Sequence, residues 1–323
     1  MPGPYVIERY NLASMGWIQN VNKDAVERGR FTPAGRMLAR SVAVATQPGD
    51  WFTRRLAAMR YTRKCPAFDM RPEDGYAILP PDRLPGTSQI VDQCRRLFER
   101  KQAELTPIPA KSKGKKSFLR NVLDDEDLRA NPALVDFALS DGLLSIVTSY
   151  LGVVPILNRV DLVYSIARAT PDAEHISSQL FHQDHEGLRQ AKVFLNIFDV
   201  GEEHGPFTLI PASRTEQVLR AIRRQRREAG IEQHGHYRDD EVAAHGGLAE
   251  QVRSIGPAGT AAIVDTSRCL HAGSRVQQGH FRLCLYIQYC TTEEKANTFD
   301  GERFRRDPVR WLAIKRHAAG PGA

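Results

Sequence analysis

The residues best suited to chemistry are a histidine and a carboxylate two positions apart, His182 and Asp184. On a β-strand, residues i and i+2 point to the same face, so the imidazole and the carboxylate would converge. A second histidine, His271, follows a strand-like run at residues 259–265 and is the candidate third ligand. Two histidines and one carboxylate, with open metal positions left over, are typical of non-haem Fe(II) oxygenases. These three side chains therefore predict a catalytic iron site.

A His-x-Asp tripeptide also occurs by chance, and an arginine further along the chain strengthens the prediction. Arg282 lies on a strand-like run at residues 281–287, which begins shortly after His271. The planar guanidinium group of arginine grips a carboxylate through two parallel hydrogen bonds. Arg282 is therefore the candidate partner of a dicarboxylate cosubstrate.

An ordered set of motifs within residues 155–290 resembles the phytanoyl-CoA dioxygenase family of Fe(II)/2-oxoglutarate-dependent oxygenases. The set comprises His182-Gln183-Asp184, Glu203-His204-Gly205-Pro206-Phe207, Ile210-Pro211-Ala212-Ser213-Arg214, His271-Ala272-Gly273-Ser274, and Arg282, eleven residues after His271. The family usually has Glu-Asn-Gly-Pro where this chain has Glu203-His204-Gly205-Pro206. Some members carry a serine two residues after the distal histidine that helps to hold 2-oxoglutarate, and Gly273 occupies that position here.

The resemblance implies a mainly β fold with packed helices, whose core is a double-stranded β-helix, or jelly roll. It implies that His182, Asp184 and His271 bind Fe(II), that 2-oxoglutarate and O2 are cosubstrates, and that Arg282 binds the distal carboxylate of 2-oxoglutarate. Decarboxylation of 2-oxoglutarate to succinate and CO2 would accompany hydroxylation of an unactivated C–H bond in a small-molecule metabolite. The family accepts many substrate classes, so the resemblance does not name the primary substrate.

Three residues that alternate along one expected strand, Lys192, Phe194 and Asn196, are further candidates for the site. If their shared face is inward, Lys192 and Asn196 would contact the cosubstrate and Phe194 would form a wall of the pocket. An ordinary outward-facing lysine is the alternative for Lys192. Gln183, between the two ligands, would point to the opposite face.

Other functions are compatible with these residues. The same iron centre could catalyse desaturation, epimerisation or cyclisation in a biosynthetic pathway. Halogenation is disfavoured, because halide binding usually requires loss of the carboxylate ligand that Asp184 supplies. A metal cupin that uses no 2-oxoglutarate would not need Arg282, and a non-catalytic binding protein on the same fold would not need the complete ligand set.

The chain has 323 residues, 41% of them hydrophobic, and a formal net charge of +7. No run approaches the roughly eighteen apolar residues of a membrane helix. The five cysteines show no paired spacing and no secretory signal is visible, which favours reduced thiols and a cytoplasmic protein. The positive charge permits an anionic small molecule, nucleic acid or a membrane surface as partner, but no nucleic-acid motif is visible. We expect a small-molecule substrate, and the sequence leaves the oligomeric state open.

Hydrophobic spacing and capping residues predict the elements that position the site. Helices are expected at residues 34–44, 52–59, 88–104, 131–139 and 141–151, the last ending at Gly152, with a proline-rich loop at residues 71–85. Strands are expected at residues 156–166, 179–184, 191–198, 207–210, 261–265 and 282–289. Two basic segments, a loop at residues 111–116 and a helix at residues 219–227, are expected to be solvated.

We expect a single domain over residues 1–323. Residues 1–154 would form mostly helical support, residues 155–292 the jelly-roll core, and residues 293–323 a C-terminal tail. A long polar segment at residues 213–255 interrupts the strands, and the resemblance places such an insertion over the barrel mouth as a lid. Tyr237, within this segment, is a candidate substrate contact. A surface helical excursion without a substrate role is the alternative.

Overall fold

The structure is a computed structural model that describes residues 48–105, 118–168, 174–184, 189–232, 235–291 and 299–314. The contacts of the chain separate residues 1–51 from a compact unit at residues 52–323, which contains the two sheets and the candidate site. The helix expected at residues 34–44 and the basic loop expected at residues 111–116 lie outside the described residues.

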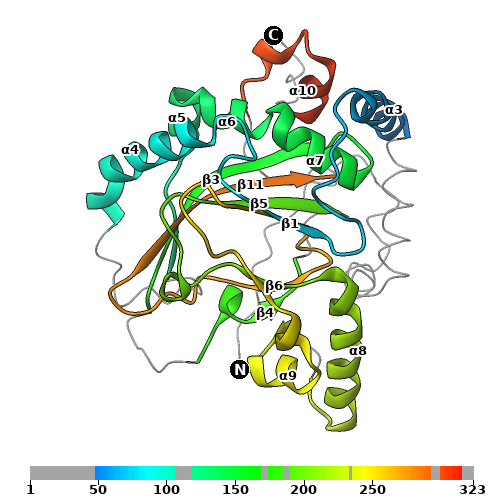
Figure 1. Cartoon of the computed structure of the whole chain (residues 1–323), viewed down its shortest axis with the longest axis vertical. Coiled ribbons are helices and arrows are strands. Elements are labelled where there is room, and N and C mark those ends of the chain that lie inside the picture. Colours follow the sequence, from blue (N-terminus) through cyan, green and yellow to red (C-terminus); the bar gives the residue numbers. More distant parts are fainter. Residues whose placement is uncertain are drawn as a thin grey trace, which may run out of the picture. The chain divides into compact units, whose positions relative to one another are not determined.

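Two antiparallel β-sheets form the centre of the compact unit (Figure 1). The larger sheet has the order β1 (Tyr76–Leu79), β9 (Ala261–Val264), β5 (Gln190–Asn196), β11 (Phe281–Cys290), β3 (Ile156–Ile166) and β2 (Leu119–Asn121). The smaller sheet has the order β7 (His236–Tyr237), β4 (Phe181–His182), β10 (Leu270–Ala272), β6 (Thr208–Ile210) and β8 (Val252–Arg253). Buried Phe207, Leu209 and Cys269 pack against Ala262 and Val264 of β9, so the two sheets face each other.

Strands β3 and β11 pair over their whole length and fix which side chains face the smaller sheet. Arg282 stands opposite Ser165, and Tyr286 stands opposite Asp161. Opposed residues of an antiparallel pair share a face, so all four point into the space between the sheets. The intervening residues, such as Leu285, are fully buried on the other face. The strands expected at residues 156–166 and 282–289 are confirmed.

Helices cover the outer face of the larger sheet (Figure 1). They include α4 (Thr87–Leu105), α5 (Asp125–Ala130), α6 (Pro132–Ala138) and α7 (Asp141–Leu151), while α3 (Pro48–Lys64) and α10 (Pro308–Ala313) lie near one end of the sheet. Helix α6 packs against β3, and α7 packs against β5. Gly152 ends α7 with φ 71°, the left-handed conformation that glycine adopts without strain, as the sequence predicts.

Helix α8 (Ala212–Glu228) covers the outer face of the smaller sheet, together with α9 (Asp239–Ala244). Its apolar stripe of Val218, Leu219 and Ile222 packs against Phe181 of β4 and its neighbours. The expectation that the whole basic segment is solvated is wrong at Arg226. This arginine is 2% exposed, because its guanidinium group pairs with Glu241 of α9.

Two sequence-based assignments differ from the structure. The loop expected at residues 71–85 contains the edge strand β1, because its prolines flank Tyr76–Leu79 rather than interrupt it. The strand expected at residues 179–184 is reduced to Phe181–His182, because a 3₁₀ turn at Ser177–Gln179 precedes it and Asp184 hydrogen-bonds to a loop. Asn131 precedes Pro132 at the start of α6, but its side chain does not cap that helix.

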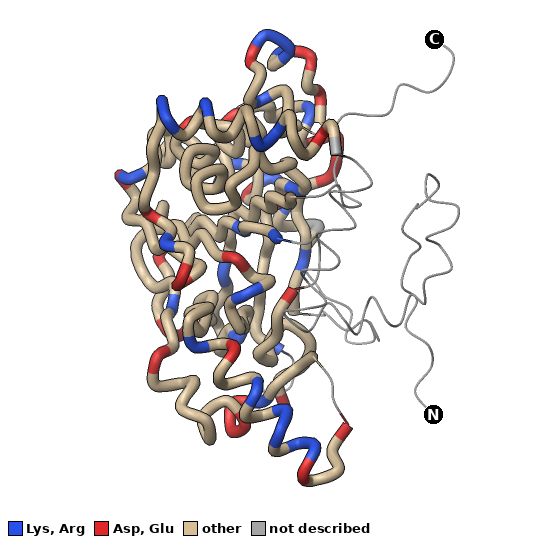
Figure 2. The backbone as a smooth tube through the Cα atoms, turned by 90° about the vertical axis from the view of Figure 1, so that its right-hand side faces the viewer, with Lys and Arg blue, Asp and Glu red and all other residues tan. Residues whose placement is uncertain are grey.

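Charged residues of both signs are mixed along the described chain (Figure 2). Among the described helices, none is by itself long and apolar enough to cross a membrane, and only the bent pair α6 and α7 passes such a test on length and composition.

Candidate metal centre

Two histidines meet because β4 and β10 are neighbouring strands of the smaller sheet. His182 ends β4 and stands directly opposite His271 in the middle of β10. The centroids of the two rings are 4.3 Å apart, as expected for opposed side chains on one face. The adjacent Phe181, Leu270 and Ala272 belong to the apolar cluster under α8. The alternation of the strands therefore directs both imidazoles into the space between the sheets.

The backbone orients both rings in the same way. The Nδ1 atom of His182 is 2.9 Å from the carbonyl oxygen of Leu180, and Nδ1 of His271 is 3.1 Å from the carbonyl oxygen of Cys269. A proton on Nδ1 would be donated to that carbonyl, which leaves the lone pair of Nε2 free for a metal. In each histidine, a carbonyl two residues earlier in the chain thus selects the ligating nitrogen.

Asp184 completes the cluster from just beyond the end of β4. Its backbone N–H donates to the carbonyl oxygen of Thr266 at 2.9 Å. Its Oδ1 atom lies 3.6 Å from His182 Nε2, and its Oδ2 atom lies 3.3 Å from His271 Nε2. Ligand atoms of the three side chains all lie within 4.8 Å of one another. Ligands about 2.1 Å from a metal are about 3 Å apart when adjacent, so small side-chain shifts would close the set around one ion.

The surroundings favour the protonation states that bind a metal. Burial, and then the neighbouring His271, lowers the pKa of His182 to about 3, so its imidazole is neutral near pH 7. Burial by itself would raise the pKa of Asp184, but the Lys192 ammonium group and the two histidines lower it well below the usual range. A neutral imidazole and an ionised carboxylate are the ligand forms that a divalent metal requires.

Lys192 faces inward, so the outward-facing alternative is wrong. It lies on β5, is 5% exposed, and its Nζ atom is 2.7 Å from Asp184 Oδ2. Phe194, two residues further along, shares its face and stacks on Phe207 with ring centroids 4.0 Å apart. Lys192 and the aromatic wall formed by Phe194 therefore lie next to the three candidate ligands, as the alternation along β5 predicts.

Arg282 is buried in the same space without an acidic partner among the described residues. Its side chain lies on the inner face of β11, and the residue is 7% exposed. Its Nη2 atom donates to Ser274 Oγ at 3.4 Å, and its buried Nε atom has no hydrogen-bond partner in the described structure. Burial lowers the pKa of Arg282, because the guanidinium charge is poorly solvated between the sheets. A buried cation of this kind fits an anionic ligand.

Ser274, the residue after Gly273, places a hydroxyl group beside Arg282. Its Oγ atom lies between Arg282 and Ser165, at 3.4 Å from Arg282 Nη2 and 3.0 Å from Ser165 Oγ. Ser274 has φ 59°, a left-handed conformation that is uncommon outside glycine. This turn of the backbone brings the serine beside the arginine. The signal in the sequence was the serine next to Gly273.

A single cavity of about 510 Å³ joins these groups. Its wall includes His182, Asp184 and His271 at one part and Arg282 with Ser274 at another. The remaining lining residues include Phe194, Phe207, Tyr286, Cys284, Lys192, Arg120 and Arg159. The three candidate ligands and the buried arginine therefore open into one space.

Two candidate residues do not line this cavity. The side chain of Asn196, on β5, donates to the carbonyl oxygen of Ser254 at 3.3 Å. Tyr237, on β7, is 4% exposed and belongs to the apolar cluster between α8 and the smaller sheet. The described residues of the segment 213–255 are not part of the cavity wall, but His236 of β7 stacks on the His182 ring with centroids 5.5 Å apart. The lid role expected for this segment stays a prediction.

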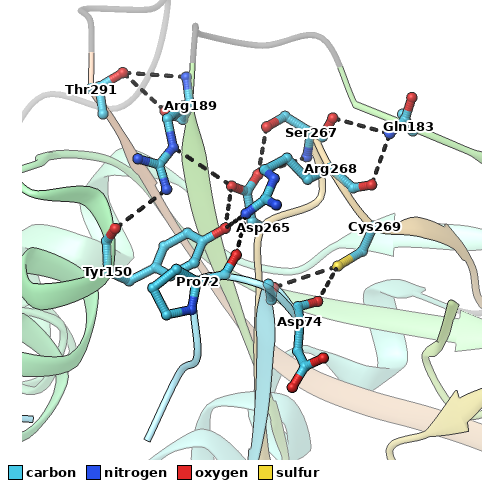
Figure 3. A network of polar contacts seen from close by, with 11 residues as sticks. Pro72, Asp74, Tyr150, Gln183, Arg189, Asp265, Ser267, Arg268, Cys269 and Thr291 are labelled. Atoms are coloured by element: carbon cyan, nitrogen blue, oxygen red, sulfur yellow. Dashed lines mark hydrogen bonds and ion pairs between the residues drawn. The ribbon is translucent and has the colours of Figure 1, made fainter. Parts of the chain in front are cut away.

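A buried polar network, which the sequence did not predict, lies next to the segment that carries Gln183 and Asp184 (Figure 3). Asp265, fully buried at the end of β9, accepts a hydrogen bond from Tyr150 Oη at 2.7 Å and one from the backbone N–H of Ser267 at 3.2 Å. The side chain of Gln183, between the two metal-ligand candidates, donates to the carbonyl oxygens of Ser267 and Arg268 at 3.2 and 2.9 Å. Gln183 thus points away from the cavity, as predicted, and ties the ligand segment to a fixed loop.

No protein-family model matches the sequence, and no curated protein matches it. Several solved structures are similar. The α-ketoglutarate-dependent non-haem epimerase SnoN from nogalamycin biosynthesis shows 14% identity and a TM-score of 0.42, over 73% of this chain and 81% of its own. HygX from Streptomyces hygroscopicus, with nickel and 2-oxoglutarate bound, shows 16% identity and a TM-score of 0.43, over 71% and 87%. EctD from S. alaskensis, with 2-oxoglutarate and 5-hydroxyectoine, shows 15% identity and a TM-score of 0.47, over 79% and 83%. All three TM-scores are below 0.5, so the functional conclusion depends on this chain's own site.

Proposed function

We propose that this chain is a non-haem Fe(II)- and 2-oxoglutarate-dependent oxygenase on a double-stranded β-helix core of the phytanoyl-CoA dioxygenase type. One observation carries the proposal. Arg282, a buried cation without an acidic partner among the described residues, opens into the same cavity as His182, Asp184 and His271. Two histidines and a carboxylate suit Fe(II), and the separate arginine suits the far carboxylate of a dicarboxylate.

The chain's own residues would bind, orient and shield the reactants. His182, Asp184 and His271 would hold the iron, and Arg282 with Ser274 would bind the distal carboxylate of 2-oxoglutarate. Bound Fe(II) and 2-oxoglutarate would supply the oxidising chemistry with O2. Stacked Phe194 and Phe207 line the cavity and would limit access of water to the reacting centre.

Lys192 fits a role at the metal end of the cavity. Its ammonium group contacts Asp184 Oδ2 at 2.7 Å, so it would orient that carboxylate towards the iron. It would also be the nearest cation for the carboxylate of 2-oxoglutarate that approaches the metal. Hydroxylation of a C–H bond in a small molecule is the expected reaction, with desaturation, epimerisation or cyclisation on the same iron as the alternatives. Halogenation is disfavoured, because Asp184 supplies the third protein ligand. A cupin without 2-oxoglutarate would leave buried Arg282 without a ligand.

The proposal is tested by 2-oxoglutarate decarboxylation and metal content, measured together. The parent protein should release CO2 from 2-oxoglutarate only when Fe(II) is present. Asp184→Ala should lose both bound iron and decarboxylation, because two histidines alone bind the ion weakly. Normal decarboxylation by folded Asp184→Ala would refute the ligand set.

A matched control is available on the surface. Glu203, His204 and His280 form another cluster of ligand-type side chains among the described residues, and His280 is exposed. His280→Ala removes one histidine without touching the cavity, so iron content and decarboxylation should match the parent. Loss of bound iron in this control would place the metal at the surface cluster instead.

A further inference from the structure

The smaller sheet carries a row of four rings, two of which belong to the candidate metal ligands. In the strand order β7, β4, β10 and β6, these rings are His236, His182, His271 and Phe207, the residue before β6. Successive ring centroids are 5.5, 4.3 and 5.4 Å apart, and the two outer pairs are nearly parallel, at 23° and 26°. Such spacings are typical of rings that attract one another. His236 is therefore the outer ring beside the ligand His182.

Strand β4, which ends in His182, has only two residues and depends on its neighbours for its position. On one side, β10 sets His271 opposite His182. On the other side, β7 sets Tyr237 opposite Phe181 and His236 opposite His182. Opposed residues share a face of the sheet, so Tyr237 joins Phe181 in the apolar cluster under α8, and His236 lies on the face of the ligands. Strand β7 therefore holds the ligand strand from the side away from β10.

Buried Arg226 of α8 keeps β7 in this position. Its Nε and Nη2 atoms pair with the two carboxylate oxygens of Glu241 on α9 at 2.6 and 2.8 Å. Its Nη2 atom also donates to the backbone carbonyl oxygen of His236 at 2.9 Å, and its guanidinium carbon lies 4.7 Å from the centre of the Tyr237 ring. A two-point pair between arginine and carboxylate fixes both position and orientation. The two helices outside the smaller sheet are thus connected to the strand that carries His236 (Figure 1).

We propose that His236 is a positioning residue of the metal centre, whose ring keeps the His182 imidazole in the orientation that binds the metal. The hydrogen bond to the carbonyl oxygen of Leu180 fixes one edge of the His182 ring, and the stacked His236 ring limits tilting of its plane. Among the described residues, the ligand atoms that meet here come from His182, Asp184 and His271, so His236 acts through its ring and not as a ligand. The inference rests on the proposed function and gives α8, β7 and α9 a role in metal binding.

The test is calorimetric titration of Ni(II) into the full-length parent and three variants, with Asp184→Ala as the blank that measures Ni(II) bound elsewhere. His236→Ala should raise the Kd for Ni(II) about three- to tenfold, the effect of losing one aromatic pair. His236→Leu, which keeps an apolar side chain without a ring, should bind as weakly. His236→Phe keeps a ring without a ligating nitrogen and should restore the Kd close to that of the parent. The visible absorption of bound Co(II), which reports ligand geometry, should change in His236→Ala and return in His236→Phe.

His245→Ala is the matched control, because His245 follows α9 in the same segment and its Nε2 atom lies 2.8 Å from Gln225 Oε1 of α8. It should leave the Kd and the Co(II) spectrum unchanged. Parent-like Ni(II) binding by His236→Ala or His236→Leu would overturn the positioning role. Equal loss in His236→Phe would also overturn it, because a nitrogen atom rather than the ring would then be responsible. A parent that binds Ni(II) no better than Asp184→Ala would instead overturn the proposed function.

Discussion

Replacing Arg282 with methionine should affect cosubstrate binding and protein stability in opposite directions. Methionine has a similar length and keeps the buried volume nearly filled, but it carries no charge. Without ligand, Arg282 is a buried cation with an unpaired Nε atom among the described residues. Ser274 keeps its contact with Ser165 at 3.0 Å after the change. The substitution therefore removes an unfavourable group without leaving a new one.

The magnitudes follow from these contacts. A buried donor without a partner costs about 1–3 kcal/mol, so the ligand-free variant should gain stability of that order. Each kcal/mol corresponds to about 2–4 °C in Tm for a domain of this size. The lost charged pair with 2-oxoglutarate should cost about 2–5 kcal/mol of binding, which raises the Kd at least about 30-fold.

The assay is thermal unfolding of the metal-loaded protein with and without 2-oxoglutarate, combined with calorimetric titration of 2-oxoglutarate. The parent should be strongly stabilised by 2-oxoglutarate, whereas Arg282→Met should start at a higher Tm and gain little. Arg220→Gln, on the exposed side of α8, should behave like the parent. A variant with a lower starting Tm and an unchanged 2-oxoglutarate Kd would refute the reasoning.

Three further outcomes are expected. Gly205→Ala should destabilise the fold severely, as shown by urea unfolding, because Gly205 has φ 62° and an added Cβ would lie 2.5 Å from a backbone carbon. Asp265→Asn should lower the free energy of unfolding by about 1–3 kcal/mol and weaken metal binding, because Asp265 is a buried charge that anchors the loop next to Asp184. Tyr150→Phe should lower the free energy of unfolding by only about 1 kcal/mol, because it removes a single hydrogen bond to that aspartate. Iodoacetamide at pH 8 should label Cys65 and spare Cys284, because burial raises the pKa of Cys284 to about 11, and labelling of Cys284 should increase only as the pH approaches that value.

The long strands β3, β5 and β11 of the larger sheet were the most predictable part of the fold. Residues 156–166 form β3 as expected, because the alternating apolar residues of this segment pair with those of β11 on the same face of the sheet. Elements defined by tertiary pairing were missed. Strand β2 has three residues and gains its form only by pairing with β3, and β1 forms only because β9 provides an edge. The local sequence does not indicate which distant strand will pair with such a short segment.

The candidate ligands were predictable because residue type and order carry the information. The distances between these ligands were not predictable, because they depend on the strand register that sets His182 opposite His271. Asn196 and Tyr237 show the limit of the sequence argument. Asn196 shares a strand face with Lys192 but hydrogen-bonds to Ser254, and Tyr237 packs under α8. Which polar side chain reaches a cavity depends on neighbours that are distant in the sequence.

The most direct test of the central claim is the coupling between metal and 2-oxoglutarate. If the three ligands and Arg282 form one site, 2-oxoglutarate should bind at least about tenfold more tightly with Ni(II) than without metal, a coupling of about 1.4 kcal/mol or more. Calorimetric titration of 2-oxoglutarate into parent and Asp184→Ala, each with and without Ni(II), measures this coupling. The account predicts strong coupling in the parent and none in Asp184→Ala. Equal affinity with and without metal in the parent would contradict it.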